Sequence, residues 1–257
     1  MSRLRQRIAV YPKGPSLVTT LTWDYPDGEI VPEHVHPEDQ LVYASRGVMT
    51  VRTRERTWVV PPQRAVWIPA RVPHSIAMSG SVSMRTVYFR ARYVRSLPRT
   101  CSVMNVLPLL RELIVYACTF PKLDRRRPVH AHLIDSIVDQ LQTVETVPLQ
   151  LPAVSDPRAA RVAGALSRDP GDGRNLDQLC RDAGASKRTI ERLFQTEAKM
   201  SLGEWRQQVR LMRALQLLAS GEKITRVALD TGYSTPSAFI SMFRRALGQT
   251  PRRYFAS

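Results

Sequence analysis

Four side chains in the N-terminal half of the chain have the chemistry to bind a metal ion. They are His34, His36, Gln40 and His74. Imidazole nitrogens suit Zn, Ni, Fe or Cu, and three of them can hold a divalent ion with positions left open for water or an effector. Gln40 offers a neutral oxygen, which is a weaker ligand than a carboxylate. The alternative is a metal-free polar pocket in which the histidines bond to backbone groups.

Two sets of side chains in the C-terminal half have the chemistry to contact DNA. The first set lies on an expected helix over 187–197 and at its start: Ser186, Lys187, Arg188, Thr189, Glu191, Arg192 and Gln195. The second lies on an expected helix over 236–247: Pro236, Ser237, Ile240, Ser241 and Arg244. Long polar side chains on a helix reach base edges, and arginine is the commonest partner of guanine. Residues at a helix start suit phosphate contacts, as for Ser186 and Lys187.

The second set has shorter side chains and less charge than the first. We therefore expect it to read bases less specifically, with Ile240 suited to contact a thymine methyl group.

Two helix-turn-helix patterns would position these sets. In the first, a helix over 176–183 turns at Gly184 into the helix over 187–197. In the second, a helix over 224–230 turns at Gly232 into the helix over 236–247. A helix over 201–219 joins them, and its length can hold the two reading helices about 34 Å apart, one turn of DNA.

Helix-start signals recur through this region. Asp156, Thr235 and Thr250 each precede a proline, which suits the first helical position. Ser201 with Glu204, and Asn175 with Gln178, have the spacing of capping boxes. We predict seven helices in succession over 157–257.

The N-terminal region has a different pattern. Residues 17–95 contain short runs rich in β-branched and aromatic residues, separated by proline and glycine, including Gly47. This spacing predicts a small antiparallel barrel or sandwich. Apolar residues recur at helical spacing over 101–146, which predicts a helical pair that either forms a dimer interface or caps the barrel.

The fold expected is therefore α+β. We predict a sensor domain over 1–98, a helical connector over 99–147, a linker over 148–156 and a DNA-binding domain over 157–257.

Composition limits the classes of protein. The 257 residues carry a net charge of +16, and residues 157–257 hold 18 Lys and Arg against nine Asp and Glu, a net +9. This charge favours an anionic partner. The sequence has no apolar run long enough to span a membrane and no signal peptide, so we expect a cytoplasmic, nucleoid-associated protein. We expect the three cysteines to be reduced structural thiols.

The C-terminal region resembles the AraC/XylS family of bacterial transcriptional regulators. The resemblance is strongest over Gly232-Tyr233, Phe239, Phe243-Arg244, Gly248, Thr250-Pro251 and Tyr254. It implies binding of double-stranded promoter DNA at two adjacent major grooves, with RNA polymerase as a further partner if the protein is an activator. It also implies base reading at Arg188, Glu191 and Arg192, and at Pro236, Ser237 and Ser241. Pro236 departs from the pattern because it has no side-chain donor.

The N-terminal region resembles a cupin. The intervals between Gly28, His34, His36, Gln40 and Gly47 are those of the first cupin motif, with Gln40 in place of its glutamate. The stretch up to His74 is similar to the second motif, with Arg71 in place of a glycine and Met78 in place of an asparagine. The resemblance implies strands that aim the histidines at one metal inside a barrel.

Regulators of the AraC/XylS family often carry such a domain, so the resemblance implies that it binds a small-molecule effector or mediates formation of a homodimer. The main hypothesis is therefore a transcriptional regulator with an effector- or metal-responsive cupin domain. The alternatives are a metal-dependent cupin enzyme with an appended nucleic-acid-binding module, and a cupin that serves only in dimerisation. His130 and His132 lie in the helical region, and we do not expect them to be ligands.

Overall fold

The computed structural model describes residues 17–143 and 150–255. The basic N-terminus and the stretch where the predicted connector meets the predicted linker lie outside this part of the chain. The described residues form two compact units, one containing 17–53 and 60–143, the other containing 54–59 and 150–255.

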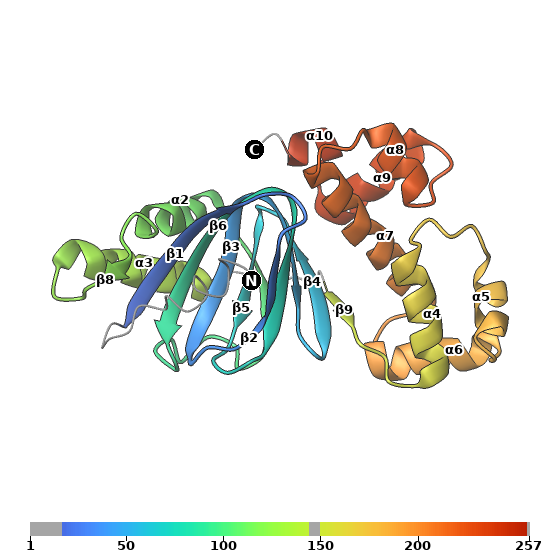
Figure 1. The fold of residues 1–257 in the computed structure, drawn as a ribbon, viewed down its shortest axis with the longest axis horizontal. Coiled ribbons are helices and arrows are strands. Elements are labelled where there is room, and N and C mark those ends of the chain that lie inside the picture. Colours follow the sequence, from blue (N-terminus) through green and yellow to red (C-terminus); the bar gives the residue numbers. More distant parts are fainter. Residues whose placement is uncertain (1–16, 144–149, 256–257) are drawn as a thin grey trace, which may run out of the picture. The chain divides into compact units, whose positions relative to one another are not determined.

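The first unit is built on an antiparallel sheet (Figure 1). Its strands are β1 (Val18–Tyr25), β2 (Ile30–His34), β3 (Glu38–Arg52), β5 (Arg64–Ile68), β6 (His74–Arg90), β7 (Ser102–Asn105) and β8 (Lys122–Leu123). The order across the sheet is β7-β5-β3-β6-β1-β8, and β2 pairs with β6. The prediction of an antiparallel, cupin-like sheet domain is confirmed.

The long strand β3 passes through Gly47 without ending there, so the predicted break at this glycine is wrong. Gly47 has φ +77°, and the register between β3 and β6 shifts on either side of Arg46. A Cβ atom at position 47 would lie 2.6 Å from the backbone oxygen of Ser81. The glycine therefore bends the strand and lets a neighbouring backbone approach, rather than terminating the pairing.

Two helices, α2 (Pro108–Ala117) and α3 (Pro128–Thr143), share one apolar core with one face of the sheet. Leu110 and Ile114 of α2 and Ile134 of α3 are buried in this core with Leu41 of β3 and Val87 of β6. The helical pair therefore caps the sheet. Strands β7 and β8 also fall within the predicted helical connector, where the sequence pattern did not indicate them.

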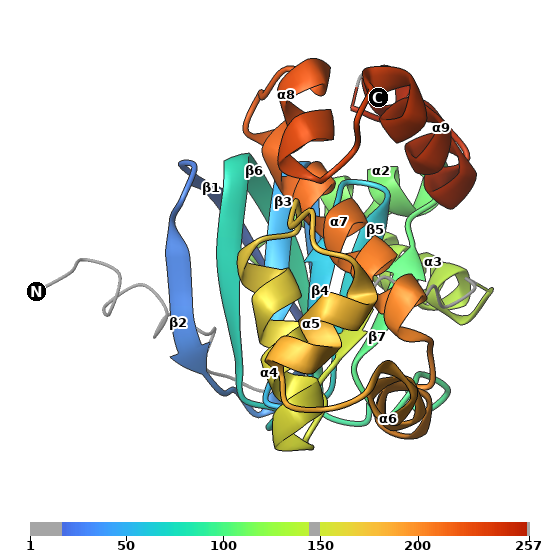
Figure 2. The same cartoon turned by 90° about the vertical axis from the view of Figure 1, so that its right-hand side faces the viewer.

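The second unit is mainly helical (Figures 1 and 2). Its helices are α4 (Pro157–Arg168), α5 (Leu176–Asp182), α6 (Lys187–Leu193), α7 (Leu202–Ala219), α8 (Ile224–Asp230), α9 (Pro236–Leu247) and α10 (Pro251–Tyr254). A π-helical turn, Phe194–Ala198, continues α6. The predicted succession of seven helices is confirmed for the described residues from 157 to 255. Strand β9 (Gln150–Pro152), within the predicted linker, pairs with β4 (Arg56–Val60).

Side-chain caps set most of these helix starts. The side chains of Asp156, Asn175 and Thr235 accept backbone N–H groups of the first turn, and Ser201 with Glu204 forms the complete capping box. Two details of the prediction are wrong. Gln178 bonds to Asp182 instead of closing a box with Asn175, and Thr250 makes no side-chain cap bond.

Apolar stripes hold the helices together. The predicted stripe of α7 is buried along its whole length: Leu202, Trp205, Val209, Met212 and Leu215. In α9, Phe239 and Phe243 are buried as expected, but Met242 completes the buried face. Leu247, the last residue of α9, is only partly buried, which corrects its predicted place in that stripe.

No helix in the described part of the chain has the length and apolar character needed to cross a bilayer.

Candidate metal centre and DNA-reading helices

The fold brings the three predicted histidines of the sheet domain together. His34 ends β2 and lies opposite His74, the first residue of β6, while His36 follows β2 by two residues. One candidate ligand atom from each histidine lies within 4.8 Å of those from the other two. Among the described residues, no Asp, Glu or Cys joins this group. The site is therefore made of three imidazoles.

Backbone carbonyls orient all three rings. The Nδ1 atoms of His34, His36 and His74 lie 2.9, 2.8 and 2.9 Å from the carbonyl oxygens of Pro32, Glu38 and Val72. A carbonyl oxygen only accepts, so each Nδ1 carries the proton and donates. The Nε2 atom of a neutral ring then keeps its lone pair, which is the form that binds a metal.

The environment keeps two of the rings neutral. Burial lowers the pKa of His74 to about 3 and also lowers the pKa of His34, against the effect of their carbonyl bonds. His74 is fully buried, and its Nε2 has no hydrogen-bond partner among the described residues. Burying an acceptor without a hydrogen-bond partner costs free energy. This nitrogen is therefore a candidate ligand atom for a metal ion.

Gln40 lies beside these histidines on the face of the sheet that α2 and α3 do not cover. Its Nε2 donates to the hydroxyl oxygens of Thr86 (3.1 Å) and Tyr88 (3.0 Å). These bonds orient its Oε1 toward His36 Nε2, at 2.9 Å. Both ring nitrogens of His36 therefore lie within hydrogen-bond distance of an oxygen acceptor.

Thr86 and Tyr88 were not predicted as site residues. They lie two apart on β6 and therefore on one face of the sheet, and that alternation is the signal in the sequence that could have identified them.

A short turn supports the histidines. Arg71 N–H donates to the carbonyl of His36 (2.9 Å), and Arg71 adopts φ +64°. This left-handed conformation favours glycine, which explains why the second cupin motif has a glycine where this chain has Arg71. Asp39 accepts the backbone N–H groups of Ala70 (2.8 Å) and Arg92 (2.9 Å), which fixes the turn from the other side.

The helical unit exposes the first predicted DNA-contacting set on α6. Ser186, Lys187, Arg188, Arg192 and Gln195 are exposed, while Thr189 and Glu191 are half-buried. Ser186 Oγ accepts from Thr189 N–H (3.2 Å) and so caps the helix. Lys187 lies 3.6 Å from the carboxylate of Asp177 on α5. On the inner side, Ile190 and Phe194 pack into the core, so α6 has a fixed inner face and a polar outer face.

Glu191 has a structural contact that the sequence did not indicate. Its Oε2 accepts the N–H of Leu202, the first residue of α7, at 3.0 Å. A carboxylate at a helix N-terminus also interacts favourably with the helix dipole. In this arrangement Glu191 holds the start of α7, which competes with its predicted role in base reading.

The second predicted set lies on α9. Pro236, Ser237, Ser241 and Arg244 are exposed and Ile240 is half-buried. Pro236 is the first residue of the helix, where its missing N–H group costs nothing.

Comparison with known proteins agrees with both the sheet domain and the helical unit. Residues 17–154, more than half of the chain, match the family described as AraC-like ligand binding domain. Residues 179–257 match the family described as helix-turn-helix domain. The chain belongs to the AraC family of transcriptional regulators.

Relatives of this AraC-family chain include transcriptional regulators. The HTH-type transcriptional regulator NimR of Escherichia coli is 35% identical over 225 residues, which cover 88% of this chain and 82% of NimR. The regulatory protein SoxS of Salmonella typhimurium is 35% identical over 81 residues, which cover 31% of this chain and 76% of SoxS.

Solved structures similar to this AraC-family chain include ToxT from Vibrio cholerae with a bound unsaturated fatty acid. The match has a TM-score of 0.38 and 11% identity, and it covers 94% of this chain and 95% of ToxT.

For the AraC-family regulator described here, the structure separates the predicted candidates into clear groups. It brings His34, His36, His74 and Gln40 into one cluster, and it leaves His132 exposed on α3. His130 is buried, and its Nδ1 accepts the N–H of Asp124 at 3.1 Å, so its part in the helical core is structural. None of the three cysteines forms a disulfide.

Proposed function

We propose that this AraC-family regulator binds promoter DNA by placing α6 and α9 in successive major-groove segments. The observation that carries the proposal is the outer face of α6, where Lys187, Arg188, Arg192 and Gln195 are exposed on a helix whose inner face is fixed in the core. Side chains of this kind on a positioned helix read base edges. The net charge of +9 over residues 157–257 supplies attraction to phosphates.

A selection of preferred sites from randomised double-stranded DNA tests this proposal. Wild-type protein should enrich a two-part sequence motif. In binding measurements by fluorescence anisotropy, Arg192→Ala should weaken binding to the selected site by about 1–3 kcal/mol and relax the preference at one position. The control Arg181→Ala removes the same charge from α5 and should not relax sequence preference. Enrichment of no sequence by the wild type would contradict the proposal.

We further propose that His34, His36 and His74, with Gln40, hold a divalent transition metal such as Zn, Ni or Fe. Two features support the fit. His74 Nε2 is buried without a partner among the described residues, and His36 Nε2 lies 2.9 Å from Gln40 Oε1. Two ligand atoms each about 2.1 Å from one ion, at roughly right angles, lie about 3 Å apart, so the separation of His36 Nε2 and Gln40 Oε1 also suits two ligands of one cation. The ion would supply open positions for an effector.

Metal content distinguishes a metal centre from a metal-free pocket. After incubation with Zn, Ni or Fe salts and removal of excess ion, we expect about one ion per wild-type chain by elemental analysis. His74→Ala should lose most of this metal, because three imidazole ligands become two and Gln40 is a weak ligand. His132→Ala, at an exposed histidine of α3, is the matched control and should retain it. Equal metal content in wild type and His74→Ala would contradict the proposed site.

The same cluster also favours the alternative of a metal-dependent cupin enzyme, since open metal positions suit substrate activation. Loss of a chemical activity in His34→Ala with DNA binding intact would support that alternative. Loss of an effector response at the bound DNA would support the regulator.

Homodimerisation through the helical pair, and contact with RNA polymerase, are further proposals. Exposed apolar side chains on α2, at Leu109 and Tyr116, support the first of these. Sedimentation of the purified protein tests it.

A further inference from the structure

The loop between α4 and α5 is held by two arginines of α7. Arg206 donates from its guanidinium to the carbonyl oxygens of Arg174 (3.0 Å) and Asp172. Arg210, one helical turn further on, donates from Nε to the carbonyl oxygen of Pro170 (3.0 Å). Residues four apart lie on the same face of a helix, so α7 uses one face to bind three carbonyls of this loop.

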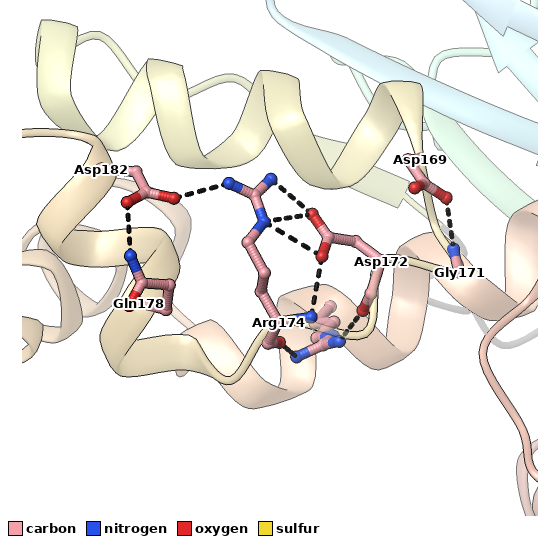
Figure 3. A network of polar contacts seen from close by, with 7 residues as sticks. Asp169, Gly171, Asp172, Arg174, Gln178 and Asp182 are labelled. Carbon is pink, nitrogen blue, oxygen red and sulfur yellow. Dashed lines mark hydrogen bonds and ion pairs between the residues drawn. The ribbon is translucent and has the colours of Figure 1, made fainter.

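The same loop is tied to the first helix-turn-helix motif (Figure 3). The Arg174 side chain pairs with Asp172 in the loop (2.5 Å) and with Asp182, the last residue of α5 (2.6 Å). Asp172 is only 8% exposed, and its carboxylate also accepts the Arg174 N–H. Helix α5 packs directly against α6. The loop therefore helps to fix the position of α6, the first reading helix, through α5.

The loop also contacts the turn of the second motif. A Cβ atom at Gly171 would lie 2.9 Å from the carbonyl oxygen of Asp230, the last residue of α8. A Cβ atom at Gly232, in the turn before α9, would overlap the Arg210 guanidinium and lie 3.1 Å from the Gly171 carbonyl oxygen. Arg210 also lies over the ring of Tyr233, 5.6 Å from its centre. Both glycines therefore sit at close approaches between the loop, α7 and the second motif.

We infer that Arg206 and Arg210 are positioning residues that fix the distance between the two reading helices and so set the operator spacing that the protein accepts. The long α7 connects the motifs covalently, but a single helix does not fix the rotation of each motif about its ends. The loop at 169–174 supplies that second connection, because it is hydrogen-bonded to α7, ion-paired with α5 and packed closely against the α8–α9 turn. This inference rests on the proposed reading of DNA by α6 and α9.

The test compares spacing rather than affinity alone. Wild-type protein is first used to select its preferred site from randomised DNA. Binding is then measured to that site and to versions with one base pair inserted or deleted between the two contacted segments. We expect the wild type to bind the altered sites about tenfold more weakly, a penalty comparable to losing one base contact.

Arg206→Met and Arg210→Met keep much of the apolar side chain but remove the donors. In both, the spacing penalty should fall to about threefold or less, because either motif can then rotate to meet its groove. Asp182→Asn is a second, milder variant that weakens the ion pair between the loop and α5, together with the Gln178–Asp182 bond within α5, and it should reduce the penalty in part. Arg213→Met is the matched control, because Arg213 is exposed on α7, and it should keep the full penalty.

The outcomes distinguish a failure of the proposed function from a failure of this inference alone. A wild type that selects no DNA motif contradicts the proposed function, and this inference with it. Folded Arg206→Met, Arg210→Met and Asp182→Asn variants that all keep the wild-type penalty contradict the inference alone. Circular dichroism and thermal unfolding establish which variants are folded.

Discussion

Arg71 and Gly47 show how single backbone conformations shape the sheet domain. Arg71 adopts the left-handed region although it is not glycine, and its N–H bond to His36 holds it there. Gly47 adopts the same region at a place where no side chain fits. The first position tolerates a side chain because Arg71 is exposed, whereas a Cβ atom at the second would meet the backbone of β6.

Gly47→Ala and Gly28→Ala should therefore differ in their effect on stability. Both glycines have φ +77°, so both variants carry about 1–2 kcal/mol of backbone strain. Only Gly47→Ala adds a clash, because its Cβ would meet Ser81 while nothing lies within 4 Å of the Cβ at Gly28. We expect a loss of about 3 kcal/mol or more for Gly47→Ala. Hydrogen exchange of β3 and β6 peptides measures both losses, and equal losses would refute the role of the clash.

At the scale of the element, the helix starts were predictable because their signals are local. A cap side chain bonds to a backbone group two or three residues away, so the sequence contains both partners. The predicted start of α9 matches the structure for this reason, because the Thr235 side chain caps it. The predicted bounds of α8 also match, although its N-cap residue, Lys223, makes no side-chain cap bond. Strand β7 was missed because its pairing partner, β5, lies far away in the sequence.

Ser201→Ala tests the contribution of a cap to the helix that joins the two motifs. The variant removes the bond that Glu204 N–H donates to Ser201 Oγ (3.2 Å) and should cost about 1 kcal/mol of unfolding free energy. Thr250→Ala is the control at a start where the side chain makes no cap bond, and it should cost less than about 0.5 kcal/mol. Urea unfolding followed by circular dichroism measures both. A loss at Thr250→Ala as large as at Ser201→Ala would show that the cap bond is not the cause.

At the scale of the whole molecule, the location of the positive charge says more about the binding partner than the total net charge does. The chain carries +16, and a net +9 of it falls in residues 157–257, which contain both helix-turn-helix motifs. Binding to phosphates releases condensed counterions, so affinity for DNA should fall steeply as salt concentration rises.

Lys187→Ala should reduce the slope of log affinity against log salt concentration by about one, because it removes one phosphate contact at the start of α6. Lys122→Ala removes the same charge from β8 of the sheet domain and should leave the slope unchanged. Anisotropy titrations over a range of salt concentrations measure both slopes. A reduced slope for Lys122→Ala as well would show that total charge, not its location, governs binding.

The sequence by itself determined the two helix-turn-helix motifs, the cupin-like sheet and the histidine set, because periodicity, caps and motif spacing are short-range properties of the chain. Only the tertiary structure decided that Gln40 faces His36, that Glu191 binds the start of α7, and that the helical pair caps the sheet. The contacts of Arg206 and Arg210 with the 169–174 loop were likewise found only in the tertiary structure. Each of these depends on which side chain or carbonyl reaches a partner on another element, and that competition is settled by packing rather than by local sequence.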